Sequence, residues 1–412
     1  MTRSTVLLMP RALVIIPNDS YRAADFIAAA EALSVELTIA SEERPPLRPD
    51  DRFVVIDCKD PARSAEAVVD LASRSPIDAV VAADDTGVEI AALASAALGL
   101  AANPPAAAAA TLDKAAARHL LGAAEIPQPE YRLLTPDDDP AAVVAGFGAP
   151  VVIKPTMLSA GRGVLRVDRP GDAPAVADRI RAIVADARRD PTLPLLVERY
   201  VPGTEVSVEG IVWGGLVEVL AVFDKPVPME GPAFEETIFV TPSRLDSAVL
   251  DEVNRVTAAA VTALGLTEGP IHAELRIEDG RPVVIEIAAR TIGGLCGRSL
   301  RFGLLGAPLE TIVLRHALGM PKKSLRRETA AVGVAMIPIP RSGRLAGVSG
   351  LDRVGEIPSI TDIEITAHVG SRLAPPPEGD RYLGFVFSRA ERPGTVENDL
   401  MAALELIEVD IT

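Results

Sequence analysis

The sequence predicts an α/β fold combined with α+β regions: an N-terminal domain on a doubly wound parallel sheet, followed by regions with antiparallel strands. Three observations support this. At 412 residues, the chain is too long for a single hydrophobic core. Strands and helices alternate through the first part of the chain, and later strands cluster with fewer helices between them. We therefore expect three domains, over residues 1–108, 109–320 and 321–412.

The first part of the chain carries short runs rich in Val and Ile, which suit strands buried on both faces. Segments with apolar residues at helical spacing lie between these runs, and this alternation predicts a parallel sheet with right-handed crossovers. The first strand–helix turn, residues 17–20, has no glycine, so the usual dinucleotide-binding fingerprint is absent. The expected strands are 13–16, 35–39, 53–57 and 79–83, and the expected helices are 19–33, 61–73 and 86–98.

A different pattern follows the break at Asn103, Pro104 and Pro105. After a helix expected over 113–124, strands come close together, which favours antiparallel sheets. The expected strands are 151–154, 164–167, 195–199, 205–212, 217–223, 271–277 and 283–287, with helices at 173–187, 247–264 and 304–318. The last region adds expected strands at 331–337, 363–367 and 382–387 and a helix at 395–405.

Composition excludes several classes of protein. The 41 basic and 57 acidic residues give a net charge of −16, which makes nucleic acid an unsuitable general partner. The two cysteines, Cys58 and Cys296, have no metal-ligand spacing and cannot form a disulfide framework. No segment approaches the ~20 apolar residues of a membrane helix. Pro10 and Arg11 break the only apolar run near the N-terminus, which argues against a signal peptide. We expect a cytoplasmic protein without a membrane partner.

A short hairpin with two glycines, residues 158–164, follows the apolar strand that ends at Lys154; we call it the glycine loop. Its backbone N–H groups suit phosphate oxygens. Lys154 needs either solvent or an anion, and Lys114 opens a helix. The same features are also typical of an ordinary turn and of solvated lysines, and the loop matches no complete phosphate-binding motif. The candidate phosphate contacts in the loop are Ser159, Gly161, Arg162 and Gly163.

Two carboxylates flank a second turn. Glu198 ends one expected strand, Pro202 and Gly203 form the turn, and Glu205 begins the next strand. Carboxylates at these positions suit an adenine amino group and a ribose hydroxyl, and the backbone of residues 199–201 suits the adenine edge. Exposed charges on a hairpin are the alternative.

Glu274 and Glu286 lie between apolar neighbours on two adjacent expected strands. Two close carboxylates disfavour each other's ionised form unless a cation lies between them, and Mg²⁺ prefers such oxygen ligands. A two-residue turn at Asp279 and Gly280 would place Ile285, not Glu286, opposite Glu274. The metal interpretation therefore requires a three-residue loop or a bulge. The alternative is a pair of glutamates on a solvated sheet face.

Taken in this order, these residues resemble the ATP-grasp superfamily over residues 113–318. The resemblance implies an N-terminal α/β domain followed by two lobes that clamp ATP, the smaller one over about residues 125–200. It implies phosphate contacts from Lys114, Lys154 and the glycine loop. It also implies that Glu198, Arg199 and Val201 frame adenine and that Glu205 binds ribose.

The resemblance further implies that Glu274 and Glu286 bind Mg²⁺, with Mn²⁺ as an alternative ion, and that Arg290 steadies the transferred phosphate. The family usually has Asn as a further metal ligand where this chain has Ala288, so a second ion would need water or substrate oxygens in place of that ligand. The expected catalytic groups are Lys154 and Arg290.

Arg290 is followed by Gly293 and Gly294, an ending similar to that of the L-amino acid ligase branch, which forms dipeptides and related amides. The resemblance implies a ligase that activates a carboxylic acid as an acyl phosphate, couples it to an amine and releases ADP. A homodimer is common in this branch. The alternatives are a carboxylating or purine-biosynthetic ligase and a nucleotide-binding module without turnover. Candidate substrate contacts are His272, Gly293, Gly294, Arg298, Arg301 and Glu235.

Overall fold

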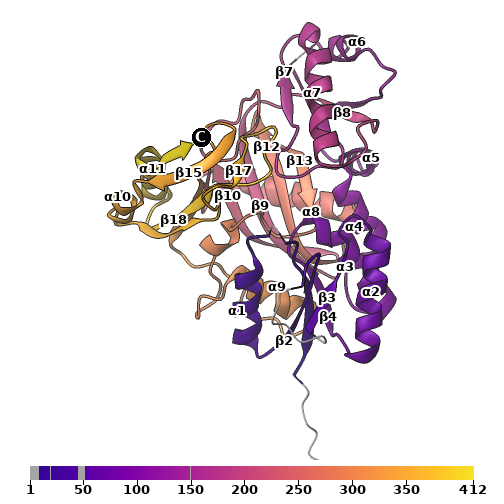
Figure 1. The fold of residues 1–412 in the computed structure, drawn as a ribbon, viewed down its shortest axis with the longest axis vertical. Helices are drawn as coiled ribbons and strands as arrows, with labels where there is room; N and C mark the ends of the chain where they lie inside the picture. Colours follow the sequence, from indigo (N-terminus) through magenta and orange to yellow (C-terminus); the bar gives the residue numbers. More distant parts are fainter. Residues whose placement is uncertain (1–8, 19, 45–51, 149) are drawn as a thin grey trace, which may run out of the picture.

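The computed structural model describes residues 9–18, 20–44, 52–148 and 150–412. Two of the predictions from the sequence concern residues outside these ranges. One is the start of the first helix at Asp19. The other is the interpretation of the N-terminal segment, which includes residues 1–8, as no signal peptide. Within the described ranges, no helix is both long and apolar enough to cross a bilayer. Figure 1 shows the N-terminal sheet at the bottom, a small lobe at the top and the C-terminal strands on the left.

The N-terminal sheet is parallel, has the strand order β3-β2-β1-β4 and is covered on both faces, as predicted. In β1, Leu13 and Ile15 belong to the core on one face, and Ala12 and Val14 to the core on the other. Helices α2 and α3 cover the first of these faces, and α1 and α9 cover the second. The bounds are β1 (Arg11–Ile15), α1 (Ala23–Leu33), β2 (Glu36–Ser41), β3 (Phe53–Val55), α2 (Pro61–Arg74), β4 (Ala79–Ala82) and α3 (Asp85–Leu98).

Helix α9 (Leu309–Ala317) comes from the middle of the chain, yet it packs against the N-terminal sheet. Its Val313 and Leu314 are buried in the same core as β1. The helix begins later than the predicted residue 304, because the residue before Pro308 is disfavoured in a helix. Leu304 and Leu305 are consequently fully exposed.

Two short helices lead from the N-terminal sheet to the rest of the chain. Helix α4 (Pro105–Leu112) lies where the sequence predicted only a break, since proline is well tolerated in the first turn of a helix. Helix α5 (Lys114–Ala123) was predicted, and the Asp113 side chain caps it by accepting a hydrogen bond from the N–H of Ala115.

The small lobe is a four-stranded antiparallel sheet in the order β5-β8-β6-β7, with α6 and α7 packed on it. Its core contains alternate strand residues such as Val151 and Ile153. The bounds are β5 (Tyr131–Leu134), α6 (Pro140–Ala145), β6 (Val151–Pro155), β7 (Leu165–Val167), η2 (Pro170–Asp172), α7 (Ala173–Asp186) and β8 (Leu195–Arg199). The sequence missed β5 and α6.

The largest sheet has the strand order β13-β12-β9-β10-β11-β14-β18-β16. Its last three strands come from the C-terminal region, so this region extends the same sheet. Helix α8 packs on the face formed by residues such as Val208 and Leu275. The bounds are β9 (Thr204–Trp213), β10 (Leu216–Lys225), β11 (Ile238–Thr241), α8 (Ser247–Ala263), β12 (Glu268–Glu278), β13 (Arg281–Ala288), η3 (Cys296–Ser299), β14 (Ala331–Met336), β16 (Ile360–Ile365) and β18 (Gly384–Ala390).

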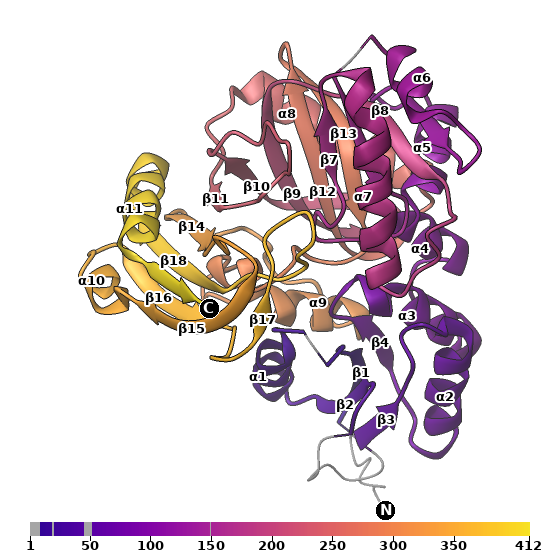
Figure 2. The same cartoon turned by 45° about the horizontal axis from the view of Figure 1, so that its top comes forward.

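The remaining C-terminal elements form a small sheet in the order β17-β15-β19 together with two helices. Figure 2 shows the loop after β17 extending toward β7 and α7 of the small lobe. The bounds are β15 (Gly343–Ser349), α10 (Leu351–Gly355), β17 (Arg372–Leu373), α11 (Pro393–Leu406) and β19 (Glu408–Ile411).

Candidate functional site

A bulge in the β12–β13 hairpin brings Glu274 and Glu286 opposite each other. The turn has only two residues, Asp279 and Gly280, both with positive φ (51° and 77°), a conformation that glycine adopts without strain. Leu275 pairs with Val284, but Glu274 pairs with Glu286, so Ile285 is the extra residue. Paired residues lie on the same face of a sheet. The metal interpretation required a three-residue loop or a bulge, and the structure has a bulge.

The neighbouring strands add further polar residues to this face. On β9, Glu205, Ser207 and Glu209 pair with Arg276, Glu274 and His272 of β12, respectively. Lys225 of β10 pairs with Glu205. The intervening residues, such as Val206 and Ala273, lie in the core under α8. Strand alternation thus gives this part of the sheet one apolar and one strongly charged face.

The Lys225 ammonium is enclosed by three carboxylates. It lies 2.7 Å from Glu205, 2.5 Å from Glu236 and 2.9 Å from Glu274, and 5.0 Å from the ring centroid of Phe239. Although burial opposes the charged form, Glu205, Glu236 and Glu274 raise the pKa of Lys225 well above its usual value. In turn, burial acts to raise the pKa of Glu274, but Lys225 and His272 hold it well below its usual value. Glu274 is therefore ionised.

His272 is held by Glu209. Its Nδ1 lies 2.5 Å from Oε1 of Glu209, whose other oxygen accepts a hydrogen bond from the N–H of Ile292. Burial acts against the charged form, but Glu209 raises the pKa of His272 to about 9. His272 Nε2 lies 3.5 Å from Glu274. The predicted substrate contact thus carries a positive charge at neutral pH and lies beside the carboxylate pair.

Lys154 and Glu198 form a buried group with Arg118. The Glu198 carboxylate lies 2.6 Å from both Lys154 Nζ and Arg118 Nε. Burial lowers the pKa of Lys154, partly offset by Glu198, whereas Arg118 and Lys154 overcome burial to lower the pKa of Glu198. Arg118 was not among the residues predicted from the sequence, although its spacing of four residues from Lys114 places both on one face of α5. The Glu198 side chain is therefore engaged by two cations.

Lys114 connects the glycine loop to the carboxylate pair. Its ammonium donates to the carbonyl oxygen of Leu158 at 2.7 Å and lies 3.3 Å from Oε1 of Glu286. A small cavity of about 10 Å³ is lined by Lys114, Arg118 and Glu286, among other residues. The structure thus brings together Lys114, Glu286 and one end of the glycine loop.

The other residues predicted to contact the nucleotide form ion pairs or hydrogen bonds within the protein. Arg162 lies 2.7 Å from Asp186 and 3.3 Å from Asp380. Arg199 forms two hydrogen bonds of 2.8 Å with Glu278. The Val201 carbonyl accepts a hydrogen bond from Arg276 at 2.9 Å, and Glu205 is buried against Arg276 as well as Lys225. In this arrangement the side chains of Arg162 and Arg199 have protein partners.

Arg290 is fixed by a residue of the N-terminal domain. Its guanidinium donates to the two oxygens of Asp85 at 2.9 and 3.0 Å. Although burial opposes both charges, each group stabilises the other, so the pKa of Arg290 is raised and that of Asp85 is lowered. Asp85 was not among the residues predicted from the sequence. Its position just after β4, where parallel strands present their carboxyl ends, was an available signal.

The remaining candidate substrate residues have different surroundings. Arg298 lies 2.9 Å from Asp25 and 3.2 Å from Glu364, and Arg301 donates to the carbonyl oxygens of residues 298 and 300. Burial raises the pKa of Glu235. Gly293 has open space where a side chain would begin. At Gly294 a Cβ would lie 2.7 Å from the Phe385 ring, so only glycine fits without a shift.

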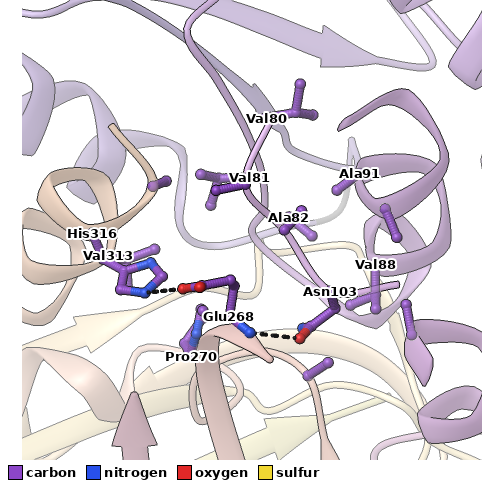
Figure 3. Close-up of a pocket in the computed structure, with 17 residues that line it drawn as sticks. Val80, Val81, Ala82, Val88, Ala91, Asn103, Glu268, Pro270, Val313 and His316 are labelled. Carbon is purple, nitrogen blue, oxygen red and sulfur yellow. Dashed lines mark hydrogen bonds and ion pairs between the residues drawn. The ribbon is translucent and has the colours of Figure 1, made fainter. Parts of the chain in front are cut away.

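A larger cavity, of about 70 Å³, lies between the N-terminal sheet, the start of β12 and α9 (Figure 3). Its polar groups bond to one another: Glu268 lies 3.1 Å from His316, and its N–H donates to Asn103 at 3.0 Å. None of the predicted site residues lines this cavity. It is therefore separate from the charged sheet face.

Comparison with known families fits this geometry. Residues 147–299 match the ATP-grasp domain, and residues 27–101 match the ATP-grasp N-terminal domain. The chain belongs to the ATP-grasp superfamily. Residues 335–412 match the L-amino acid ligase C-terminal domain 2. The ATP-grasp match thus covers the glycine loop, both glutamates and Arg290.

Individual relatives have low sequence identity to this chain. Alanine–anticapsin ligase from Bacillus subtilis is 28% identical over 245 residues, 55% of this chain and 51% of that protein. D-alanine–D-alanine ligase from Cupriavidus taiwanensis is 27% identical over 196 residues, 46% of this chain and 57% of that protein. The chain spans only about half to three fifths of the length of such curated relatives.

Solved ATP-grasp structures show the same fold. L-amino acid ligase from Bacillus licheniformis superposes with a TM-score of 0.79 over 98% of this chain and 99% of that one, at 23% identity. Carboxyaminoimidazole ribonucleotide synthase from Aspergillus clavatus, solved with ATP, gives a TM-score of 0.74 over 96% and 98%, at 18% identity. At these identities the likeness establishes the fold.

Proposed function

We propose that this ATP-grasp protein is a carboxylate–amine ligase, which converts an amino-acid-like carboxylic acid to an acyl phosphate and couples it to an amine, with release of ADP and phosphate. The observation that carries the proposal is the pairing of Glu274 with Glu286 on a charged sheet face, where Lys114 contacts both Glu286 and the glycine loop. The relatives named as ligases, and the C-terminal match to L-amino acid ligases, support the same reaction.

The carboxylate pair fits one Mg²⁺ ion. Both ligands are hard oxygens, Glu274 is ionised, and Glu286 retains 29% side-chain exposure. Mn²⁺ has the same preference for oxygen and fits the same pair. Ala288, opposite His272 on this face, adds no side-chain ligand, which favours one ion over two. When bound, such an ion offsets negative charge on the phosphates of ATP.

The residues of the chain would then act mainly by position and charge. The substrate carboxylate oxygen attacks the γ-phosphorus and the bond to the ADP oxygen breaks; the amine then attacks the acyl carbon and phosphate leaves with the C–O bond electrons. Lys114, Lys154 and Arg290 would offset the charge on the transferred group. The glycine loop would exclude water, which otherwise hydrolyses the acyl phosphate.

The protonated His272 beside Glu274 would contribute another positive charge to this face. Glu198 is buried between Arg118 and Lys154, so its role would be to hold Lys154 in place. We propose that the adjoining backbone, residues 199–201, contacts the adenine edge, and that Glu205 serves the ribose.

The test is ADP and phosphate release from ATP with a panel of amino acids and small carboxylic acids, with and without Mg²⁺. We expect release that requires Mg²⁺ and both an acid and an amine, with a new amide detected by mass spectrometry. ADP formation with bicarbonate or a ribonucleotide instead would establish the carboxylase or purine-biosynthetic alternative. Tight ATP binding without turnover on any substrate would establish the non-catalytic module, for which Ala288 is the supporting observation.

Two further proposals follow from the family. We propose a homodimer, to be tested by light scattering of the purified protein at several concentrations. We also propose a cytoplasmic location, to be tested by fractionation of cells that express the tagged chain.

A further inference from the structure

A C-terminal segment lies against the glycine loop. We call residues 375–382 the strap. The N–H of Gly163 donates to the carbonyl oxygen of Pro377 at 2.8 Å. Arg162 donates to the carbonyl oxygen of Glu378 at 3.1 Å and pairs with Asp380 at 3.3 Å. These partners are more than two hundred residues apart in sequence, and Figure 2 shows the loop after β17 reaching the small lobe.

The strap also contacts α7. Arg179 of α7 lies 2.6 Å from Oε1 of Glu378 and donates a second hydrogen bond to the same oxygen from Nε at 2.7 Å. The glycine loop and α7 are thus tied to one short segment through Arg162, Gly163 and Arg179. Each side-chain pair is exposed and individually weak, but a set of contacts to one segment acts together.

The strap holds only one end of the glycine loop. The N–H groups of Ser159, Ala160 and Gly161 have no hydrogen-bond partner among the described residues, whereas that of Gly163 is engaged by Pro377. Free backbone donors in a turn bind phosphate oxygens. The strap therefore fixes the loop without occupying these donors.

The other end of the strap reaches the N-terminal domain and the carboxylate cluster, by which we mean Glu205, Glu236 and Glu274 around Lys225. Tyr382 Oη donates to Oε2 of Glu236 at 3.0 Å, and Glu236 contacts Lys225 beside Glu274. The Tyr382 carbonyl accepts a hydrogen bond from Tyr21 at 3.5 Å. One segment thus contacts the glycine loop, Glu236 of the carboxylate cluster, and the first domain.

We propose that the strap positions the glycine loop, and that Glu378 and Asp380 are positioning residues which hold the loop in place. The part of this proposal that concerns ATP rests on the proposed function. The mechanical part, that the strap holds the loop, does not, and it is tested without nucleotide.

The test is a charge swap across the pair of Arg179 and Glu378, read by hydrogen–deuterium exchange of the peptide 158–164 in the full-length protein. Arg179→Glu and Glu378→Arg should each speed exchange about two- to fivefold, the range expected from losing an exposed ion pair. The double variant should restore slow exchange. Asp172→Asn, which alters an exposed pair with Arg169 outside the strap, should leave exchange unchanged.

Unchanged exchange in both single variants would overturn the proposal. Exchange in the double variant as fast as in the single variants would overturn it as well, because reversing both charges restores the ion pair but does not repair a general loss of structure. If the protein is active, Asp380→Asn should raise KM for ATP with a smaller effect on kcat. An inactive protein with swap-sensitive exchange would refute the proposed function and retain the strap. An active protein whose exchange rate is unaffected by the charge swap would support the proposed function and refute the strap proposal.

Discussion

Asp85 and Arg290 form a two-pronged ion pair across the boundary between the N-terminal sheet and the largest sheet, with N–O distances of 2.9 and 3.0 Å. Paired hydrogen bonds of this kind fix the plane of a guanidinium as well as its charge. The first domain therefore sets the orientation of the arginine that we assign to phosphate transfer.

Replacing Asp85 by Asn tests this relationship. The variant keeps the size of the side chain but removes its charge and one acceptor, so Arg290 loses a partner. We expect the free energy of unfolding to fall by about 1–3 kcal/mol and turnover to fall as well. Urea unfolding and ADP release measure the two effects. Asp70→Asn, at an exposed position of α2, is the matched control, and equal behaviour of the two variants would contradict the assignment.

Glu286→Gln tests the carboxylate pair. The amide retains an oxygen but carries no charge, so we expect Mg²⁺-dependent ADP formation to drop at least about 100-fold, because several kcal/mol of charge stabilisation are lost. Circular dichroism should be unchanged, since Glu286 is partly exposed. Glu252→Gln on the exposed side of α8 is the control. Turnover that survives in Glu286→Gln would remove this residue from the metal site.

Lys225→Met leaves three carboxylates without their shared cation. Oxygens of Glu205, Glu236 and Glu274 lie within 4.8 Å of one another, so their repulsion should lower the melting temperature. Added Mn²⁺ should recover more of the loss than it adds to the unaltered protein, because a divalent ion can replace the ammonium. Differential scanning fluorimetry with and without Mn²⁺ measures this.

The exposed Lys322, which lies over the Trp213 ring, supplies the control: Lys322→Met should respond to Mn²⁺ like the unaltered chain. A Lys225→Met protein with the same Mn²⁺ response would show that the ammonium does not occupy a cation position.

Both cysteines should resist alkylation in the folded protein. Burial, with a contribution from Glu42, raises the pKa of Cys58 to about 12, and burial also raises the pKa of Cys296. At pH 8 the Cys58 thiolate is then only about one part in ten thousand, and the thiolate is the reactive form. Mass spectrometry after iodoacetamide treatment at pH 8 should find little modification until urea is added. Rapid labelling of the native chain would contradict the assigned burial.

The sequence predicted the features that follow from local pattern. Apolar runs identified β1 and β4, and Asp113 marked the start of α5. The metal interpretation required a three-residue loop or a bulge between Glu274 and Glu286, and the structure has the bulge, at Ile285. These signals lie within a few residues of the feature they predict. Edge strands such as β5 and β19 have only four residues each, charged ones among them, which is too short a run to give a comparable pattern.

Contacts between distant segments could not be read in this way. Nothing in the local sequence of α9 shows that its Val313 faces the first sheet, and nothing near Arg118 shows that it meets Glu198. The predicted C-terminal strands were correct in kind, but their joining to the largest sheet depends on the pairing of β11 with β14, which is set only in the folded chain. Long-range pairing of this kind requires the whole core to form.

The position of α9 limits how this molecule can be cut or recombined. A fragment that starts after the first hundred residues would turn Val313 and Leu314 toward water, and the isolated first segment would lack the helix that closes one side of its core. Exchange of the first segment with a homologous one would therefore require α9 to be transplanted with it, even though two hundred residues of unrelated chain lie between them.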